Sequence, residues 1–136
     1  MTTRWIRPLA YVWAFPTTLV GLLFVPLAAL TGGDARVVRG VLEVHGGLVR
    51  ILLRYGTLVR GGASAMTLGH VVLGLDRETL ENTRRHERVH VRQCERWGPL
   101  FLPAYLLASL WALLDGRRPY LDNAFEREAY GQASDR

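Results

Sequence analysis

The sequence of 136 residues contains one cysteine, Cys94, and no lysine. A single cysteine excludes an intrachain disulfide and a Cys-x-x-Cys metal site, so the chain is not a disulfide-stabilised secreted scaffold. All 17 basic residues are arginines, and they are scattered among apolar stretches without forming a basic stripe. We therefore expect no nucleic-acid partner, despite the formal net charge of +5. That charge suits the anionic surface of a membrane at least as well.

Charged residues are also missing from one long apolar stretch, residues 8–31. A helix of this length, rising about 1.5 Å per residue, can cross a hydrocarbon core of about 30 Å. Aromatic residues of the kind that favours membrane interfaces lie at its start: Trp5, Tyr11 and Trp13. A cleaved signal peptide is the alternative, but the stretch exceeds the usual apolar core of about 7–15 residues and no small-residue cleavage site closes it. We expect a tail and a single transmembrane anchor over residues 1–31, and one domain over residues 32–136.

The first part of that domain is rich in β-branched residues and glycine, a composition typical of short strands joined by turns. Strands are expected over residues 37–45, 48–55 and 65–73, with Gly-Gly pairs as the turns between them. The second segment also fits a short helix, because Arg50 and Arg54 would then share one face. The sequence thus predicts a small antiparallel sheet.

The second part of the domain is predicted to be helical. Asp76 is a good N-cap for a helix over residues 77–97, which a Gly-Pro pair ends. An apolar helix over residues 100–114 follows, and Asn123 caps a last helix that carries glutamates. The predicted fold class is therefore α+β: an N-terminal transmembrane helix, a small antiparallel sheet and three further helices.

The long helix carries one sequence with metal-ligand spacing: His86-Glu87-Arg88-Val89-His90. Histidines at i and i+4 lie one turn apart on the same face, so both can bind one metal ion, and Glu87 is placed to take a proton from a metal-bound water. Zn²⁺ fits this chemistry because it is a Lewis acid without redox activity. The alternative is that these are ordinary polar positions, with Glu87 paired to Arg84. The helix pattern argues against this, because His86, His90, Gln93 and Trp97 form one stripe and the arginines lie off it.

A catalytic zinc site needs a third protein ligand. The best candidate is Glu126 in the last helix, after a connection long enough to fold back over the first helix, and Glu128 is the fallback. An alternative role for Glu126 is a capping box with Asn123. His45 and His70 remain further candidates for the third ligand.

The His-Glu-x-x-His sequence followed by Glu-x-x-Ala, within residues 64–130, resembles the gluzincin metallopeptidases. It is similar in particular to the membrane family of CAAX prenyl proteases and heat-shock membrane metallopeptidases, and to small bacterial membrane proteins with this motif pair. The resemblance implies a minimal zincin-like domain in which His86, His90 and Glu126 bind Zn²⁺ and Glu87 is the general base. It also implies that the strand before the motif helix pairs with an extended peptide.

Several other residues are candidates for supporting roles. The family usually has an aspartate where this chain has Tyr130, so the resemblance does not identify which residue supports the third ligand. His70, Tyr120 and Tyr130 are candidates to stabilise an oxyanion or to orient a ligand, although a histidine on a strand is more often structural. Cys94 lies one turn after the second histidine, but helical cysteines are usually small buried apolar residues.

The apolar segment at residues 100–114 would conflict with this site if it crossed the membrane. Glu126 would then lie on the opposite side from His86 and His90. The segment is interrupted by Pro103 and falls just below the range of about 17–25 residues for a complete span. We therefore expect a core or interfacial helix there. Arginines flank both ends of the anchor, so the side of the membrane stays undetermined.

Together these features favour a membrane-anchored zinc metallopeptidase that hydrolyses peptide bonds with a metal-activated water. Its partners would be membrane lipid and a peptide or protein substrate. Two alternatives from other classes are a non-enzymatic zinc or transition-metal protein and a metal-free membrane adaptor. A domain this small has little wall for a cleft, so lipid or a second copy of the chain is expected to complete the site.

Overall fold

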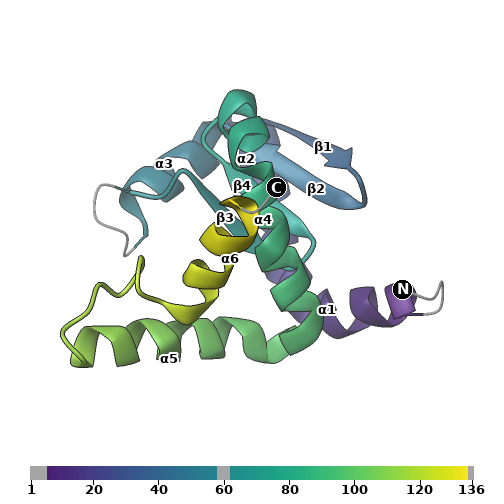
Figure 1. Cartoon of the computed structure of the whole chain (residues 1–136). Coiled ribbons are helices and arrows are strands. Elements are labelled where there is room, and N and C mark those ends of the chain that lie inside the picture. The colour runs from purple at the N-terminus through teal and green to yellow at the C-terminus, as the bar shows by residue number, and fades with distance from the viewer. Residues whose placement is uncertain (1–5, 58–61, 135–136) are drawn as a thin grey trace.

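The computed structural model describes residues 6–57 and 62–134, and Trp5 lies outside them. Figure 1 shows helices arranged around a small sheet, with the long helix α4 near the centre. The elements in chain order are α1 (Ile6–Leu22), α2 (Phe24–Leu30), β1 (Asp34–Val38), β2 (Val41–His45), α3 (Gly47–Tyr55), β3 (Ala65–Leu68), β4 (Val71–Gly74), α4 (Arg77–Trp97), the 3-10 helix η1 (Gly98–Leu100), α5 (Phe101–Leu114) and α6 (Ala124–Ser134). The predicted α+β class is confirmed.

The strands form one mixed sheet with the order β1-β2-β4-β3. β2 and β4 run parallel, whereas the two outer pairs are antiparallel. Side chains alternate between the two faces of the sheet. Val44, Val71 and Leu73 pack on the side of α2 and α3, while Val41 and Val72 pack against α4. The sheet is therefore a layer between helices, and its edge strand β3 lies beside the motif helix α4.

The prediction of a purely antiparallel sheet of three strands is wrong. Residues 37–45 contain a turn at Arg39 and Gly40, which both have positive φ (49° and 79°), so this segment is the hairpin β1–β2. Residues 65–73 contain a turn that begins at Gly69 (φ 67°) and form the hairpin β3–β4. In both cases a two-residue turn interrupts a run of β-forming residues that reads as one strand.

The middle segment, expected first as a strand, is the helix α3. Val49 and Leu53 are buried in the core, and Arg50 and Arg54 are exposed on the other face. This four-residue spacing has the helical period rather than the period of two that a strand needs. The helical alternative that the sequence left open is therefore confirmed.

The helix predictions for the second half of the domain are confirmed. The structure places α4 at Arg77–Trp97, and Asp76 Oδ1 accepts a hydrogen bond from the backbone N–H of Thr79 at 2.7 Å. Asn123 Oδ1 likewise accepts from the backbone N–H of Phe125, at the start of α6. Local capping chemistry thus sets the beginning of both helices.

Two helical stretches are long and apolar enough to cross a membrane, Pro8–Leu30 and Arg77–Leu114. Signal sequences and buried core helices can meet the same criteria of length and composition. Core helices are mostly buried, however, and only 22% and 17% of the apolar windows of these two stretches are buried. The first stretch divides at Leu23 into α1 and α2. The fold therefore presents two largely exposed apolar helical surfaces.

An ion cluster around the buried Glu43 ties the sheet to α4. Arg84 donates hydrogen bonds to both carboxylate oxygens of Glu43 on β2, each at 2.9 Å, and Arg88 Nη2 lies 3.5 Å from the same carboxylate. Burial raises the pKa of Glu43, but the two guanidinium groups outweigh this effect and hold the pKa below its usual value of 4.5. The cluster thus fixes the face of α4 that lies against the sheet.

Replacing Glu43 by glutamine should lower the free energy of unfolding by about 1–3 kcal/mol at pH 7, because two half-buried guanidinium groups lose their counter-charge. Since the folded-state pKa of Glu43 is lowered, its contribution is present above the unfolded-state pKa and is lost as the pH falls through the folded-state value. The difference between Glu43→Gln and the wild type should therefore shrink as the pH falls below about 4. Denaturant unfolding followed by circular dichroism at pH 7 and pH 3 measures both effects. Equal stability at pH 7 would contradict the structural role of the cluster.

Candidate metal centre

Three candidate metal ligands meet between α4 and α6. The Nε2 atoms of His86 and His90 lie 3.0 and 3.1 Å from Oε1 of Glu126. Ligand atoms of the three residues all lie within 4.8 Å of one another, and His90 and Glu126 are buried. The structure thus brings together the three residues that the sequence singled out as metal ligands.

The position of α6 depends on Asn123, a fully buried residue at its N-terminus. Its side-chain amide donates to the backbone oxygen of Tyr105 at 3.0 Å and to Ser109 Oγ at 2.8 Å, both on α5. Its backbone N–H donates to the backbone oxygen of Tyr120 rather than to Glu126. The capping-box alternative for Glu126 is therefore wrong, and the side chain of Glu126 points towards His86 and His90.

Gln93 fixes the tautomer of His90. The side-chain nitrogen of Gln93 donates to the backbone oxygen of Phe125 at 3.0 Å and to Glu128 Oε1 at 2.8 Å. Because both partners only accept, the amide orientation is determined, and Gln93 Oε1 faces Nδ1 of His90 at 2.8 Å. The Nδ1 atom must then carry a proton, so in the neutral ring the lone pair lies on Nε2, which faces Glu126.

This arrangement of acceptors needs a cation between them. The Nε2 atom of neutral His90 and the carboxylate oxygen of Glu126 both accept hydrogen bonds, yet they lie 3.1 Å apart. Either a proton, which makes the ring an imidazolium, or a metal ion can join them. Two imidazole nitrogens and one glutamate oxygen also form a known ligand set of catalytic zinc sites, which keep one position open for water. The donor set therefore fits Zn²⁺.

The carboxylate of Glu126 is held on both of its oxygens. Burial raises the pKa of Glu126, but the hydrogen bonds with His86 and His90 outweigh the effect of burial. Together these effects lower the pKa of Glu126 to about 2. The second oxygen, Oε2, accepts a hydrogen bond from the hydroxyl of Tyr105 at 2.5 Å. Sequence reasoning missed Tyr105, because a tyrosine in an apolar helix carries no functional signal until α5 is placed beside α6.

Glu87 is buried next to the three candidate ligands and makes no hydrogen bond with them that the structure shows. Its Oε2 atom accepts a hydrogen bond from the hydroxyl of Thr67 on β3 at 2.7 Å, and burial raises the pKa of Glu87. Arg84, the partner in the alternative interpretation, binds Glu43 instead. A raised pKa makes this carboxylate a stronger base than an exposed glutamate.

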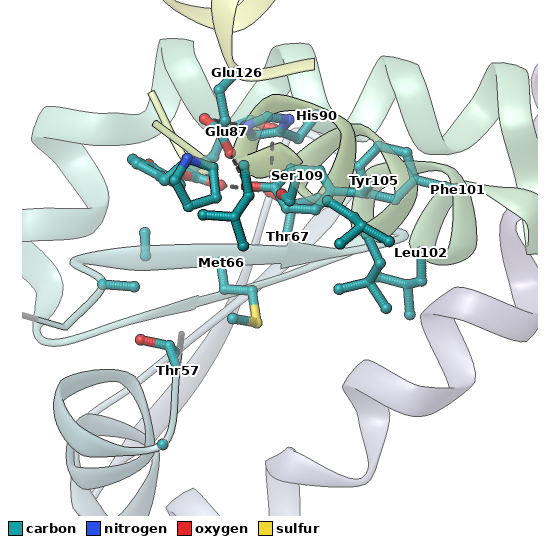
Figure 2. Close-up of a pocket in the computed structure, with 18 residues that line it drawn as sticks. Thr57, Met66, Thr67, Glu87, His90, Phe101, Leu102, Tyr105, Ser109 and Glu126 are labelled. Carbon is teal, nitrogen blue, oxygen red and sulfur yellow. Dashed lines mark hydrogen bonds and ion pairs between the residues drawn. The ribbon is translucent and has the colours of Figure 1, made fainter. Parts of the chain in front are cut away.

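A cavity of about 670 Å³ adjoins these residues. Figure 2 shows side chains from α4, α6, β3 and α5 around it: Glu87, His90, Glu126, Thr67, Met66, Phe101 and Leu102. The apolar wall of the cavity comes largely from α5, with leucines at helical spacing: Leu102, Leu106, Leu110 and Leu113. The candidate base and two of the candidate ligands therefore face one common space with a largely apolar wall.

His70 lies away from this space. Its Nε2 atom is 2.9 Å from Glu95 Oε2 on α4, and its ring stacks on that of Tyr11 on α1 with centroids 3.9 Å apart. His70 is not among the described residues that line the cavity. The placement does not support an oxyanion or ligand-orienting role for His70 and fits the structural interpretation, because its contacts join α1, the sheet and α4.

Two tyrosines lie beside the three candidate ligands. The ring of Tyr130 is 4.3 Å from that of His86, and its hydroxyl is 3.4 Å from the hydroxyl of Tyr120, which lines the cavity. Both thus lie near the cavity and the three candidate ligands. Their role as oxyanion donors stays a prediction.

Three further candidates lie outside the ligand triad. Glu128, the fallback ligand, accepts hydrogen bonds from Gln93 and Arg96, both at 2.8 Å, and so supports Gln93. His45 ends β2, which β4 separates from β3. Cys94 is buried in an apolar cluster, as expected for a helical cysteine.

Comparisons with protein families, with curated proteins and with solved structures find no match for this chain. The gluzincin resemblance therefore rests on the two sequence motifs and stays a prediction. The case for a metal centre rests on the geometry of the three side chains.

Replacing Gln93 by leucine should weaken zinc binding by about 10–100-fold, because the Nδ1 proton of His90 loses the acceptor that fixes the ring. Competition with a chromophoric zinc chelator measures the affinity. The matched control is Gln132→Leu, at an exposed glutamine of α6 that contacts Arg92, and its affinity should equal that of the wild type. Unchanged affinity in a folded Gln93→Leu variant would contradict the role of Gln93.

Proposed function

We propose that this protein is a membrane-associated, zinc-dependent peptidase. The observation that carries the proposal is that Glu87 lines the same cavity as His90 and Glu126. A metal site that only stabilises the fold does not need a buried carboxylate with a raised pKa beside it. A hydrolytic site does need one, because a water molecule must lose a proton as it attacks.

The residues of the cavity have separate roles in this proposal. When bound to His86, His90 and Glu126, Zn²⁺ would lower the pKa of a water molecule towards 7 and polarise the substrate carbonyl. Glu87 accepts the proton from the water that attacks the carbonyl carbon, while Thr67 holds one of its oxygens. As the C–N bond breaks, Glu87 gives that proton to the nitrogen of the leaving amine.

The shape of the cavity supports a peptide substrate. β3 is an edge strand of the sheet, and Ala65, Met66 and Thr67 of this strand line the cavity. An extended peptide can add to such an edge as a further strand, which would bring its carbonyl groups towards Glu87. The apolar wall from α5 would then receive an apolar side chain of the substrate.

Glu87→Gln should retain zinc and the fold but lose hydrolysis by at least about 10²-fold, because the amide keeps the shape and cannot accept the proton. Release of fluorescent peptides from labelled casein, with the protein in detergent micelles, measures the activity. Glu81→Gln is the matched control, since Glu81 is an exposed residue of the same helix. Full activity in Glu87→Gln would refute its role as the base, and a zinc-loaded wild type without activity would favour the non-enzymatic alternative.

His90→Ala and Glu126→Gln should each lose stoichiometric zinc, because each removes one of three convergent donors. Elemental analysis of the purified variants gives the metal content. Glu128→Gln is the control, because Glu128 contacts Gln93 and Arg96 rather than the donor triad. Zinc bound equally by all variants, or absent from the wild type, would contradict the metal centre.

A further inference from the structure

The helical stretch Pro8–Leu30 has its small residues inside and its large apolar residues outside. Ala14, Gly21 and Ala28 recur every seventh residue, and all three are buried. The opposite face is apolar along the whole stretch, with side chains between 41% and 85% exposed: Leu9, Val12, Leu19, Val20, Leu23, Leu27 and Leu30. A helix on the surface of a water-soluble domain has the reverse pattern, with its large apolar residues in the core.

The small residues allow α1 to approach the rest of the domain closely. A Cβ atom added to Gly21 would lie 2.7 Å from the Cβ of Val71 on β4, closer than real contacts allow. The side chain of Thr17 donates to the backbone oxygen of Gly98 at 3.2 Å. Contacts through small and hydroxyl-bearing residues are typical of helices that pack in a membrane, where lipid surrounds the large side chains.

α5 presents a second outward apolar surface. One side of α5 lines the cavity, and the other carries residues that are 65% to 78% exposed: Leu107, Trp111 and Leu114. A helix that is apolar all round is normally covered on every side. Figure 1 shows α5 along the lower edge of the molecule, whereas α1 starts at the right and runs behind α4. α1 packs against η1, the segment from which α5 extends, so the two helices that carry the exposed surfaces adjoin there.

The packing of the hairpin β1–β2 argues against a helix that crosses the bilayer. Near the start of α1, the hydroxyl of Tyr11 donates to the backbone oxygen of Gly40 in the hairpin turn. At the other end, α2 packs against β1 and β2. The hairpin thus accompanies the helix along much of its length, and its edge strand β1 carries the exposed Arg36. The backbone N–H and C=O groups of an open sheet edge find no hydrogen-bond partners in hydrocarbon. A helix that crosses the bilayer would therefore place this hairpin where it is not stable.

We propose that the outward faces of Pro8–Leu30 and of α5 lie in the acyl region of one leaflet, with both helices along the membrane surface and neither crossing it. The partner is an anionic bilayer surface, which the formal net charge of +5 complements. This arrangement replaces the complete span expected for residues 8–31. It does not depend on the metal or on hydrolysis.

Single cysteines carrying an environment-sensitive fluorophore test the proposal on the full chain, in a Cys94→Ala background. The labelled positions are Val12→Cys, Leu19→Cys, Leu27→Cys and Leu107→Cys on the outward faces, and Arg36→Cys on β1 as the control. The protein is bound to vesicles of phosphatidylcholine and phosphatidylglycerol that contain lipids with a nitroxide at carbon 5 or carbon 12. Exposed positions are used so that the substitutions do not disturb the core, and Leu23→Cys replaces Leu19→Cys if that variant fails to fold.

If the proposal is right, the nitroxide at carbon 5 quenches all four outward positions more strongly than the one at carbon 12, and position 36 is not quenched. Such a pattern corresponds to a depth of about 5–10 Å, typical of helices that lie in the interface. A crossing helix would give the strongest quenching by carbon 12 at position 19, with positions 12 and 27 shallow. That result would overturn the proposal. Absence of lipid quenching at all positions would also overturn it, and would favour a second copy of the chain as the cover.

Discussion

One oxygen of Glu126, within 3.1 Å of two imidazole nitrogens, is the constraint on which the second half of this fold depends. To meet it, the chain must leave α4, run outward along α5 and return as α6. The return is fixed by amide side chains. Asn123 ties the start of α6 to α5, and Gln93 ties α4 to the first turn of α6. A carboxylate and two imidazoles that face each other without a cation would be unstable, so these buried amides hold together a site that a metal ion would complete.

The helix α5 serves both the cavity and the outer surface, and this explains its composition. An amphipathic helix has one apolar face, because its other face meets water. α5 has apolar residues on all sides, with only Tyr105 and Ser109 as polar exceptions on the inner side. Both exceptions have partners: Tyr105 donates to Glu126, and Ser109 accepts from Asn123. The polar groups of α5 are therefore confined to the place where the site needs them.

The sequence predicted those features that depend on neighbours along the chain. Asp76 and the spacing of His86 and His90 are local, so α4 and its ligand pair could be predicted. The turn of the hairpin β1–β2 could not, because nothing in the sequence marks Arg39 as a residue with positive φ. Roles that depend on contacts between distant segments were also missed. Gln93 was recognised as part of the stripe on α4, but its function became visible only once Phe125 and Glu128 were placed beside it.

The helix α1, with its exposed apolar face, and the candidate site are parts of one structure. The angle at which α5 leaves α4 is set around Gly98, where φ is 57° and an added Cβ would lie about 2.3 Å from the indole ring of Trp13. The same indole donates to the backbone oxygen of Arg96, and Thr17 donates to that of Gly98. α1 therefore holds the junction from which the apolar wall of the cavity extends. If α1 rests in the membrane surface, the bilayer would position the cavity as well. In the proposed peptidase, an apolar segment of the substrate could then reach β3 and Glu87 without first passing through bulk water.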